Sequence, residues 1–266
     1  MKPISAIGLC AVLLALLSMP SSFIQTTASA TQPTMGILVV PYFPPTSTDW
    51  NVIYQQASAH PGAIKYIIIN PCGGPCSGSN ALSPDWQHVI SALKSSDRGI
   101  QTFGYIYYTA ESQSAIDYYM VNPAVKTDGI LFDGEGSTDH LASFTPYATY
   151  VHSLKVNHHP GVVYINPGCN CYSGEYLNGG AANLANIYEN FLITPFNIPV
   201  PAGISPQRLS AVLNLVVTCS DMVSAMKAIS NVKVGNAYVT YNPDYTTLPS
   251  YFPNEVYYAA TGVSNC

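Results

Sequence analysis

Residues 129–135 read Gly-Ile-Leu-Phe-Asp-Gly-Glu, an apolar run that ends abruptly in the carboxylate of Asp133. Residues 186–190 read Asn-Ile-Tyr-Glu-Asn and bring Glu189 to the end of a second such run. Only 9% of the chain is charged, so an acid in this position is conspicuous. A strand that is apolar along its whole length is typical of a parallel sheet covered on both faces. The two runs therefore predict parallel strands, each with a carboxylate at its C-terminal end.

The rest of the chain repeats this pattern, with short apolar runs separated by amphipathic segments. Strands are predicted at 36–42, 64–70, 100–108, 129–133, 161–166, 185–189, 213–218 and 237–241. Helices are predicted at 49–58, 84–94, 112–120, 141–156, 174–184, 220–230 and 248–259. This alternation predicts an α/β fold, a single-domain (β/α)8 TIM-type barrel over residues 31–266. An open doubly wound sheet is the alternative, but no nucleotide-binding glycine motif follows the first strand.

Residues 1–30 have the pattern of a secretory signal peptide. Lys2 supplies a positive charge, residues 6–17 form an almost unbroken apolar run, and residues 28–30 read Ala-Ser-Ala, a small-residue cleavage site. The apolar run is shorter than the ~20 residues that span a bilayer. We therefore expect a secreted, extracellular monomer that starts at Thr31 and has no membrane association once the signal is removed.

The charge balance argues against nucleic-acid binding. Without Lys2 the chain has eight basic and 14 acidic residues, so its net charge changes from −5 to −6. Such a chain lacks the basic stripe that a phosphate backbone requires. An acidic cleft suits neutral or cationic ligands, such as amino sugars.

Six cysteines remain after residue 30, namely Cys72, Cys76, Cys169, Cys171, Cys219 and Cys266. An even number in an exported chain favours disulfides, although the sequence does not fix their pairing. A zinc site built from Cys72, Cys76, Cys169 and Cys171 is the alternative, but the single residue between the last two is poor spacing for structural zinc. We therefore predict disulfides, with no metal and no cofactor.

The C-terminal ends of the strands form the catalytic face of a parallel barrel. Two carboxyl groups are the minimum for cleaving a glycosidic bond, and Asp133 and Glu189 are the candidates. The other strand ends carry tyrosines, which stack on sugar rings, and amides, which bind hydroxyls. These predicted substrate-binding residues are Tyr42, Asn70, Tyr105, Tyr107, Asn166 and Tyr241.

Each acid also has a purely structural interpretation. Asp133 suits a turn or the cap of the following helix. Glu189 suits an ion pair, although basic partners are scarce. Glu135 follows Gly134 in a Gly-Glu-Gly segment, where a solvated loop acid is the common case and a helper acid the alternative.

Histidine and serine chemistry is disfavoured. His60, His158 and His159 lie next to prolines or turns at the opposite end of the predicted strands. The sequence contains neither Gly-x-Ser-x-Gly nor His-Glu-x-x-His.

Six motifs together resemble the spherulin-4-like proteins of glycoside hydrolase family 135. They lie at residues 36–43, 69–75, 104–109, 128–133, 165–168 and 187–189, in the order found in that family. The resemblance implies a (β/α)8 barrel and a secreted endo-glycosidase that acts on galactosamine-containing polysaccharides with retention of configuration. It makes Asp133 the nucleophile and Glu189 the general acid/base, with a raised pKa and carboxyls about 5–5.5 Å apart.

One position departs from the family pattern, in which a Glu directly follows the Asp of strand four. Gly134 occupies that place, and Glu135 comes one residue later. Either Glu135 reaches the site through a bent loop or the helper acid is missing. A non-catalytic protein that binds polysaccharide with the same cleft is therefore the alternative function. A metal-dependent deacetylase is a third hypothesis, which lacks a His and Asp cluster.

Overall fold

The computed structural model describes residues 34–76, 82–94, 99–168, 174–191, 198 and 200–266. The predicted signal peptide, Cys169 and Cys171 lie outside these ranges. Residues 32–266 form one compact unit.

Eight parallel strands close into a barrel in the order β1-β10-β9-β8-β7-β4-β3-β2. Their bounds are Gly36–Val39 (β1), Ile64–Ile69 (β2), Gln101–Tyr107 (β3), Gly129–Asp133 (β4), Val162–Asn166 (β7), Leu184–Phe191 (β8), Leu209–Asn214 (β9) and Asn236–Val239 (β10). The strands β5 (Lys155–Val156) and β6 (His159–Pro160) form a separate two-stranded sheet outside the barrel. The eight barrel strands therefore lie around the ring in the order in which they occur along the chain. The predicted (β/α)8 fold is confirmed.

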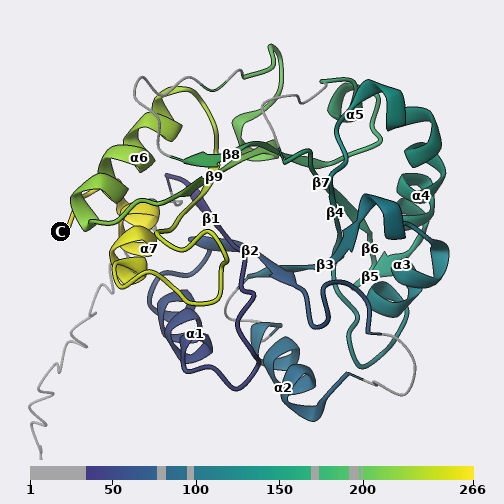
Figure 1. Cartoon of the computed structure of the whole chain (residues 1–266), viewed down its shortest axis with the longest axis horizontal. Coiled ribbons are helices and arrows are strands. Elements are labelled where there is room, and N and C mark those ends of the chain that lie inside the picture. Colours follow the sequence, from purple (N-terminus) through teal and green to yellow (C-terminus); the bar gives the residue numbers. More distant parts are fainter. Residues whose placement is uncertain (1–33, 77–81, 95–98, 169–173, 192–197, 199) are drawn as a thin grey trace, which may run out of the picture. The chain divides into compact units, whose positions relative to one another are not determined.

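The helices surround the ring of strands, as Figure 1 shows. They are α1 (Asp49–Ala59), α2 (Pro84–Leu93), α3 (Gln113–Met120), α4 (Leu141–Ser153), α5 (Glu175–Asn178), α6 (Cys219–Asn231) and α7 (Phe252–Thr261). Short 3₁₀ turns occupy Tyr108–Ala110 (η1), Thr138–His140 (η2) and Pro206–Arg208 (η3). Side-chain oxygens of Ser83, Ser112 and Thr218 accept hydrogen bonds from backbone N–H groups and so cap α2, α3 and α6.

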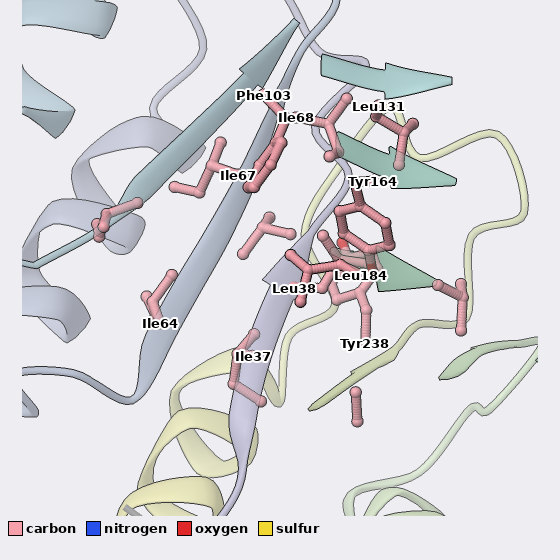
Figure 2. Close-up of a cluster of buried hydrophobic side chains, with 14 of the residues drawn as sticks. Ile37, Leu38, Ile64, Ile67, Ile68, Phe103, Leu131, Tyr164, Leu184 and Tyr238 are labelled. Atoms are coloured by element: carbon pink, nitrogen blue, oxygen red, sulfur yellow. The ribbon is translucent and has the colours of Figure 1, made fainter. Parts of the chain in front are cut away.

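The core consists of aliphatic and aromatic side chains from the strands and from the buried faces of the surrounding helices. Figure 2 shows Ile68, Phe103, Leu131 and Tyr164 gathered from neighbouring strands, with Ile67 on the opposite side of β2. All five are less than 10% exposed. Burial on both faces explains why the strands are apolar throughout, as a covered parallel sheet requires.

Several predicted boundaries were wrong. The strand expected at 213–218 is β9, at Leu209–Asn214, because Leu215 adopts a left-handed φ of 59° and ends it. The helix expected at 174–184 is only the four-residue α5, which stops at Gly179 and Gly180. The helix expected to end at 156 ends at Ser153, where the β5–β6 hairpin begins.

Two disulfides are present, Cys72–Cys76 and Cys219–Cys266, which confirms the disulfide prediction for these four residues. Among the described residues, no group of three or more His, Cys, Asp or Glu side chains is placed to hold a metal ion. Within the same ranges, no helix is both long and apolar enough to cross a membrane.

Candidate active site

The carboxyl groups of Asp133 and Glu189 converge at the C-terminal end of the barrel. Asp133 ends β4, Glu189 lies near the end of β8, and Asn166 ends the strand between them. The Asn166 Nδ2 atom donates to Asp133 Oδ1 at 2.8 Å and to Glu189 Oε2 at 2.7 Å. Since one nitrogen contacts both oxygens, these oxygens are separated by no more than the sum of the two distances, 5.5 Å.

A β-bulge aims Glu189 into the barrel. The pairing of β8 with β9 shifts register between Asn186 and Tyr188, so Ile187 is the extra residue. In a regular strand, residues three positions apart face opposite sides of the sheet. Asn186 and Glu189 nevertheless line the same hollow, because the bulge inserts one residue between them.

Each carboxyl group also accepts a hydrogen bond from a tyrosine hydroxyl. Tyr105 donates to Asp133 Oδ2 at 2.6 Å, and Tyr245 donates to Glu189 Oε1 at 2.7 Å. Asn214 Nδ2 in turn donates to the Tyr245 hydroxyl at 3.0 Å. Each carboxyl group therefore accepts a hydrogen bond from its own tyrosine and another from Asn166.

The pair lies in a hollow with a volume of about 370 Å³, including its open mouth. Its floor and walls are lined by Leu38, Val40, Ile68, Leu131 and Val212, and its polar residues are Tyr42, Tyr105, Asp133, Asn166, Asn186, Glu189 and Tyr245. A concave site with apolar walls and a few convergent polar groups is the usual form of a small-ligand site.

Burial raises the pKa of Asp133, and the negative charge of Glu189 adds to this rise, whereas hydrogen bonds from Tyr105 and Asn166 oppose it. Burial also raises the pKa values of Tyr42, Tyr105 and Tyr245, and the neighbouring carboxylates raise them further. The three tyrosines therefore remain protonated hydrogen-bond donors at neutral pH.

The predicted binding residues divide into two groups. Tyr42, Tyr105 and Asn166 line the hollow, and the Tyr42 ring packs edge-on against Tyr105 and Tyr245 at centroid distances of 6.1 and 5.6 Å. Asn70 lies outside the lining, where its Oδ1 accepts from Gly74 N at 2.7 Å and a hydrogen bond links it to Tyr42.

Tyr107 and Tyr241 are the two predicted residues with the least contact with the site. Tyr107 ends β3 and is 44% exposed, Tyr241 lies two residues beyond β10 and is 40% exposed, and neither lines the hollow. The Tyr241 hydroxyl lies 3.2 Å from Thr247 Oγ1.

Tyr245 is a site residue that the sequence analysis missed. It lies beyond β10 in a loop, with a left-handed φ of 55°, and its carbonyl accepts from Tyr42 N at 2.9 Å. The segment Asn242-Pro-Asp-Tyr245 is rich in turn residues. The sequence feature that could have identified it is a tyrosine in a turn that follows a predicted barrel strand.

Glu135 is not the solvated loop acid that was expected. It is only 2% exposed, and its Oε2 lies 3.0 Å from the Tyr176 hydroxyl. Its Oε1 lies 3.5 Å from His140 Nδ1. Burial raises the pKa of the neighbouring Glu111 to about 8, helped by the charge of Glu135 and a hydrogen bond with it. Glu135 therefore forms a second acidic cluster and does not line the hollow of Asp133 and Glu189.

Comparison with known proteins gives two findings. A family model described as spherulation-specific family 4 matches residues 36–259. Among solved structures, the chain is similar to the crystal structure of Aspergillus clavatus Sph3 in complex with GalNAc, with a TM-score of 0.70 and 20% identity, over 86% of this chain and 98% of that chain. A search among curated proteins finds no match. At this level of identity, the structural likeness shows a shared barrel fold.

Proposed function

The chain belongs to spherulation-specific family 4, and from this premise we propose that it is a secreted glycoside hydrolase that cleaves a galactosamine-containing or related amino-sugar polysaccharide. Asp133 and Glu189 are its catalytic pair. The observation that carries the proposal is the bridging of these two carboxyl groups by one amide nitrogen, in a hollow open to the barrel mouth. Membership of glycoside hydrolase family 135 is consistent with the family match and with the likeness to Sph3.

The separation of the two carboxyl groups supports a retaining mechanism. Retaining glycosidases have carboxyls about 5–5.5 Å apart, whereas inverting enzymes need about 6.5–9.5 Å to admit a water molecule. The nearest oxygens of Asp133 and Glu189 lie within 5.5 Å of each other. In the proposed mechanism, Glu189 protonates the departing glycosidic oxygen and Asp133 attacks the anomeric carbon to form a glycosyl-enzyme. Glu189 then removes a proton from the water that releases the sugar.

The raised pKa lies on Asp133, whereas the proposed roles require Glu189 to donate the proton. The strong hydrogen bond from Tyr105 to Asp133 favours the ionised form that a nucleophile needs. We therefore propose that substrate binding places the proton on Glu189.

The order of roles is testable by chemical rescue. With a substrate that carries an activated leaving group, azide should restore turnover in Glu189→Ala and give a glycosyl azide with the anomeric configuration of the substrate. An azide of inverted configuration from this variant would assign the nucleophile to Glu189 and reverse the proposed roles.

The choice of an amino sugar rests on two observations. Sph3 was crystallised in complex with GalNAc. The chain is acidic, with a formal net charge of −5, which favours cationic ligands such as a polymer containing free galactosamine. The tyrosines around the mouth supply faces for stacking on sugar rings.

Secretion, extracellular location and removal of residues 1–30 belong to the same proposal. The N-terminal pattern and the two disulfides are what an exported chain would have. Protein recovered from culture medium should begin at Thr31 by N-terminal sequencing. A retained N-terminus, or protein found solely inside cells, would refute this part.

The activity is tested by the release of reducing ends from a galactosaminoglycan. We expect Asp133→Asn and Glu189→Gln each to abolish release, while Asp85→Asn, an exposed acid on α2, serves as the matched control. Unchanged hydrolysis by either of the first two variants would refute the assignment of the pair.

A non-catalytic polysaccharide-binding protein is the second candidate. It is favoured by Gly134 at the position of the family's second acid and by the packing of Glu135 against Glu111. It predicts binding of polysaccharide without release of reducing ends, and binding that survives both substitutions of the pair.

A further inference from the structure

The barrel has an interrupted seam between β1 and β10. In the described part of the chain, these two strands pair at Gly36 with Asn236 and at Ile37 with Ala237, and each strand continues two residues beyond the last pair. An unpaired main-chain N–H group inside a protein costs free energy. The N–H groups beyond the last pair therefore need acceptors from outside the sheet.

The side chain of Glu255 on α7 supplies one such acceptor. Thr240 N donates to Leu213 O on β9 at 2.8 Å. Because successive N–H groups of a strand point to opposite neighbours, the N–H of Val239 points toward β1. It donates to Glu255 Oε1 at 2.8 Å. A carboxyl group from a helix thus takes the place of a main-chain carbonyl at the end of β10.

Glu255 is an exceptional residue on the buried face of α7. The other buried residues of this helix are Phe252, Val256, Tyr258 and Ala259. Glu255 is 0% exposed, and among the described residues it forms no ion pair, nor does its Oε2 have a hydrogen-bond partner. A buried charge without a partner is costly.

The surroundings of Glu255 therefore favour its protonated form. Burial raises the pKa of Glu255 well above its ordinary value, and the hydrogen bond from Val239 opposes this rise. The titratable groups whose pKa values respond to Glu255 are Tyr238 and Tyr251, and burial raises the pKa values of both. An uncharged acid can thus occupy the seam without a counter-ion.

The two strands meet again at the catalytic face. Tyr42 N, beyond β1, donates to Tyr245 O, beyond β10, at 2.9 Å, and the two rings pack edge-on at 5.6 Å. Tyr238, which precedes Val239, has its ring centroid 6.2 Å from that of Tyr245. The Tyr245 hydroxyl in turn donates to Glu189 at 2.7 Å. The end of β10 therefore carries the tyrosine that contacts the catalytic pair.

We infer that Glu255 is a positioning residue, an uncharged acid that fastens the end of β10 at the interrupted seam and so holds Tyr245 against Glu189. Its role in catalysis rests on the proposed function. Misplacement of a catalytic contact by 1 Å can lower a rate by about 10²-fold. A partial loosening of Tyr245 should thus be visible in kcat.

Two substitutions of Glu255 separate its hydrogen bond from its bulk. Glu255→Met keeps the length of the side chain and removes the acceptor, whereas Glu255→Gln keeps an uncharged acceptor. In Glu255→Met, hydrogen exchange of the Val239 and Tyr42 amides should become roughly tenfold faster, as expected for the loss of one hydrogen bond. Glu255→Gln should exchange like the unsubstituted protein.

Thr127→Val is the matched control. Thr127 is also 0% exposed, and its hydroxyl donates to Gly129 O at 3.0 Å, where β4 begins at the opposite end of the barrel. This variant should leave the exchange of both amides unchanged. Unchanged exchange at Tyr42 in Glu255→Met, or equal changes in Glu255→Met and Glu255→Gln, would overturn the inference.

A double-mutant cycle tests whether the effect on catalysis passes through Tyr245. Glu255→Met should lower kcat by about tenfold in the unsubstituted protein and should have no further effect in a Tyr245→Phe background. A purely structural role would lower kcat by the same factor in both backgrounds, and that result would refute the positioning role.

Carboxyl-carbon NMR of the unsubstituted protein gives a test that does not depend on a folded Met variant. The Glu255 signal, assigned by its loss in Glu255→Gln, should be that of a protonated acid at pH 7, and an ionised Glu255 would overturn the inference. If the NMR and exchange results are as expected while the protein releases no reducing ends, the proposed function fails and the structural link from Glu255 to Tyr245 stands.

Discussion

The hydroxyl group of Tyr245 is the contact to Glu189 that can be removed with the smallest change in shape. It lies 2.7 Å from Glu189 Oε1 and accepts a hydrogen bond from Asn214 Nδ2 at 3.0 Å. Hydrogen bonds to charged groups contribute about 1.5–3 kcal/mol. If this bond strengthens by that amount as Glu189 loses its proton in the transition state, Tyr245→Phe should lower kcat by roughly 10- to 150-fold.

The same substitution should also lower the stability of the fold. The Asn214 amide also loses the partner of its nitrogen, which should cost about 1–3 kcal/mol of unfolding free energy.

The assay is the initial rate of reducing-end release across a range of pH, together with urea unfolding. Tyr241→Phe is the control, because its hydroxyl contacts Thr247 outside the hollow. A kcat for Tyr245→Phe equal to that of the unsubstituted protein, or a similar loss in Tyr241→Phe, would refute the reasoning.

Three further predictions concern stability. Gly134 has a φ of +85°, and a Cβ added there would lie 2.6 Å from the Tyr108 ring, so Gly134→Ala should lower the unfolding free energy in urea by ~2–3 kcal/mol. Gly203 has a φ of +78° but open space around it, so the control Gly203→Ala should lower it by only ~1 kcal/mol. Equal losses in the two variants would count against the clash with Tyr108. The pKa of Glu111 is raised from 4.5 to about 8, so this carboxyl destabilises the fold increasingly as pH rises through that window. Over the same range, Glu111→Gln should become more stable relative to the unsubstituted protein. A difference in unfolding free energy between the two proteins that does not change with pH would contradict the shift. Replacing both Cys219 and Cys266 by Ser opens a loop with a sequence separation of 47 and should lower the unfolding free energy by about 4 kcal/mol. The same replacement of Cys72 and Cys76, with a separation of 4, should lower it by about 2 kcal/mol. A larger loss of thermal stability in the second variant than in the first would argue against the loop-entropy account.

The barrel could be predicted because the strands of a parallel sheet covered on both faces are apolar along their whole length. Residues 64–69 read Ile-Lys-Tyr-Ile-Ile-Ile, and the last three side chains are fully buried. The same rule misplaced β9, because the apolar run Leu-Val-Val at 215–217 lies beyond the strand, whereas Ser210 lies within it. Hydrophobicity alone cannot locate a strand whose interior side chains are polar.

The carboxyl pair followed from topology, since Asp133 ends β4 and Glu189 lies near the end of β8. The groups around it did not. The bulge at Ile187 turns Asn186 and Glu189 to the same side, which a strict two-residue alternation excludes. Tyr245 reaches Glu189 from a loop 56 residues along the chain. The side-chain direction of Glu135 depends on Gly134, whose positive φ no apolar pattern encodes.

Covalent trapping tests the catalytic pair most directly. A 5-fluoro galactosaminyl fluoride should react with a retaining enzyme of this specificity and leave a glycosyl-enzyme that peptide mapping can locate. We predict one glycosyl adduct per chain, attached to Asp133 and absent from Asp133→Asn. An adduct on a residue outside the Asp133–Glu189 pair, or continued hydrolysis of the polysaccharide by Asp133→Asn, would contradict the account.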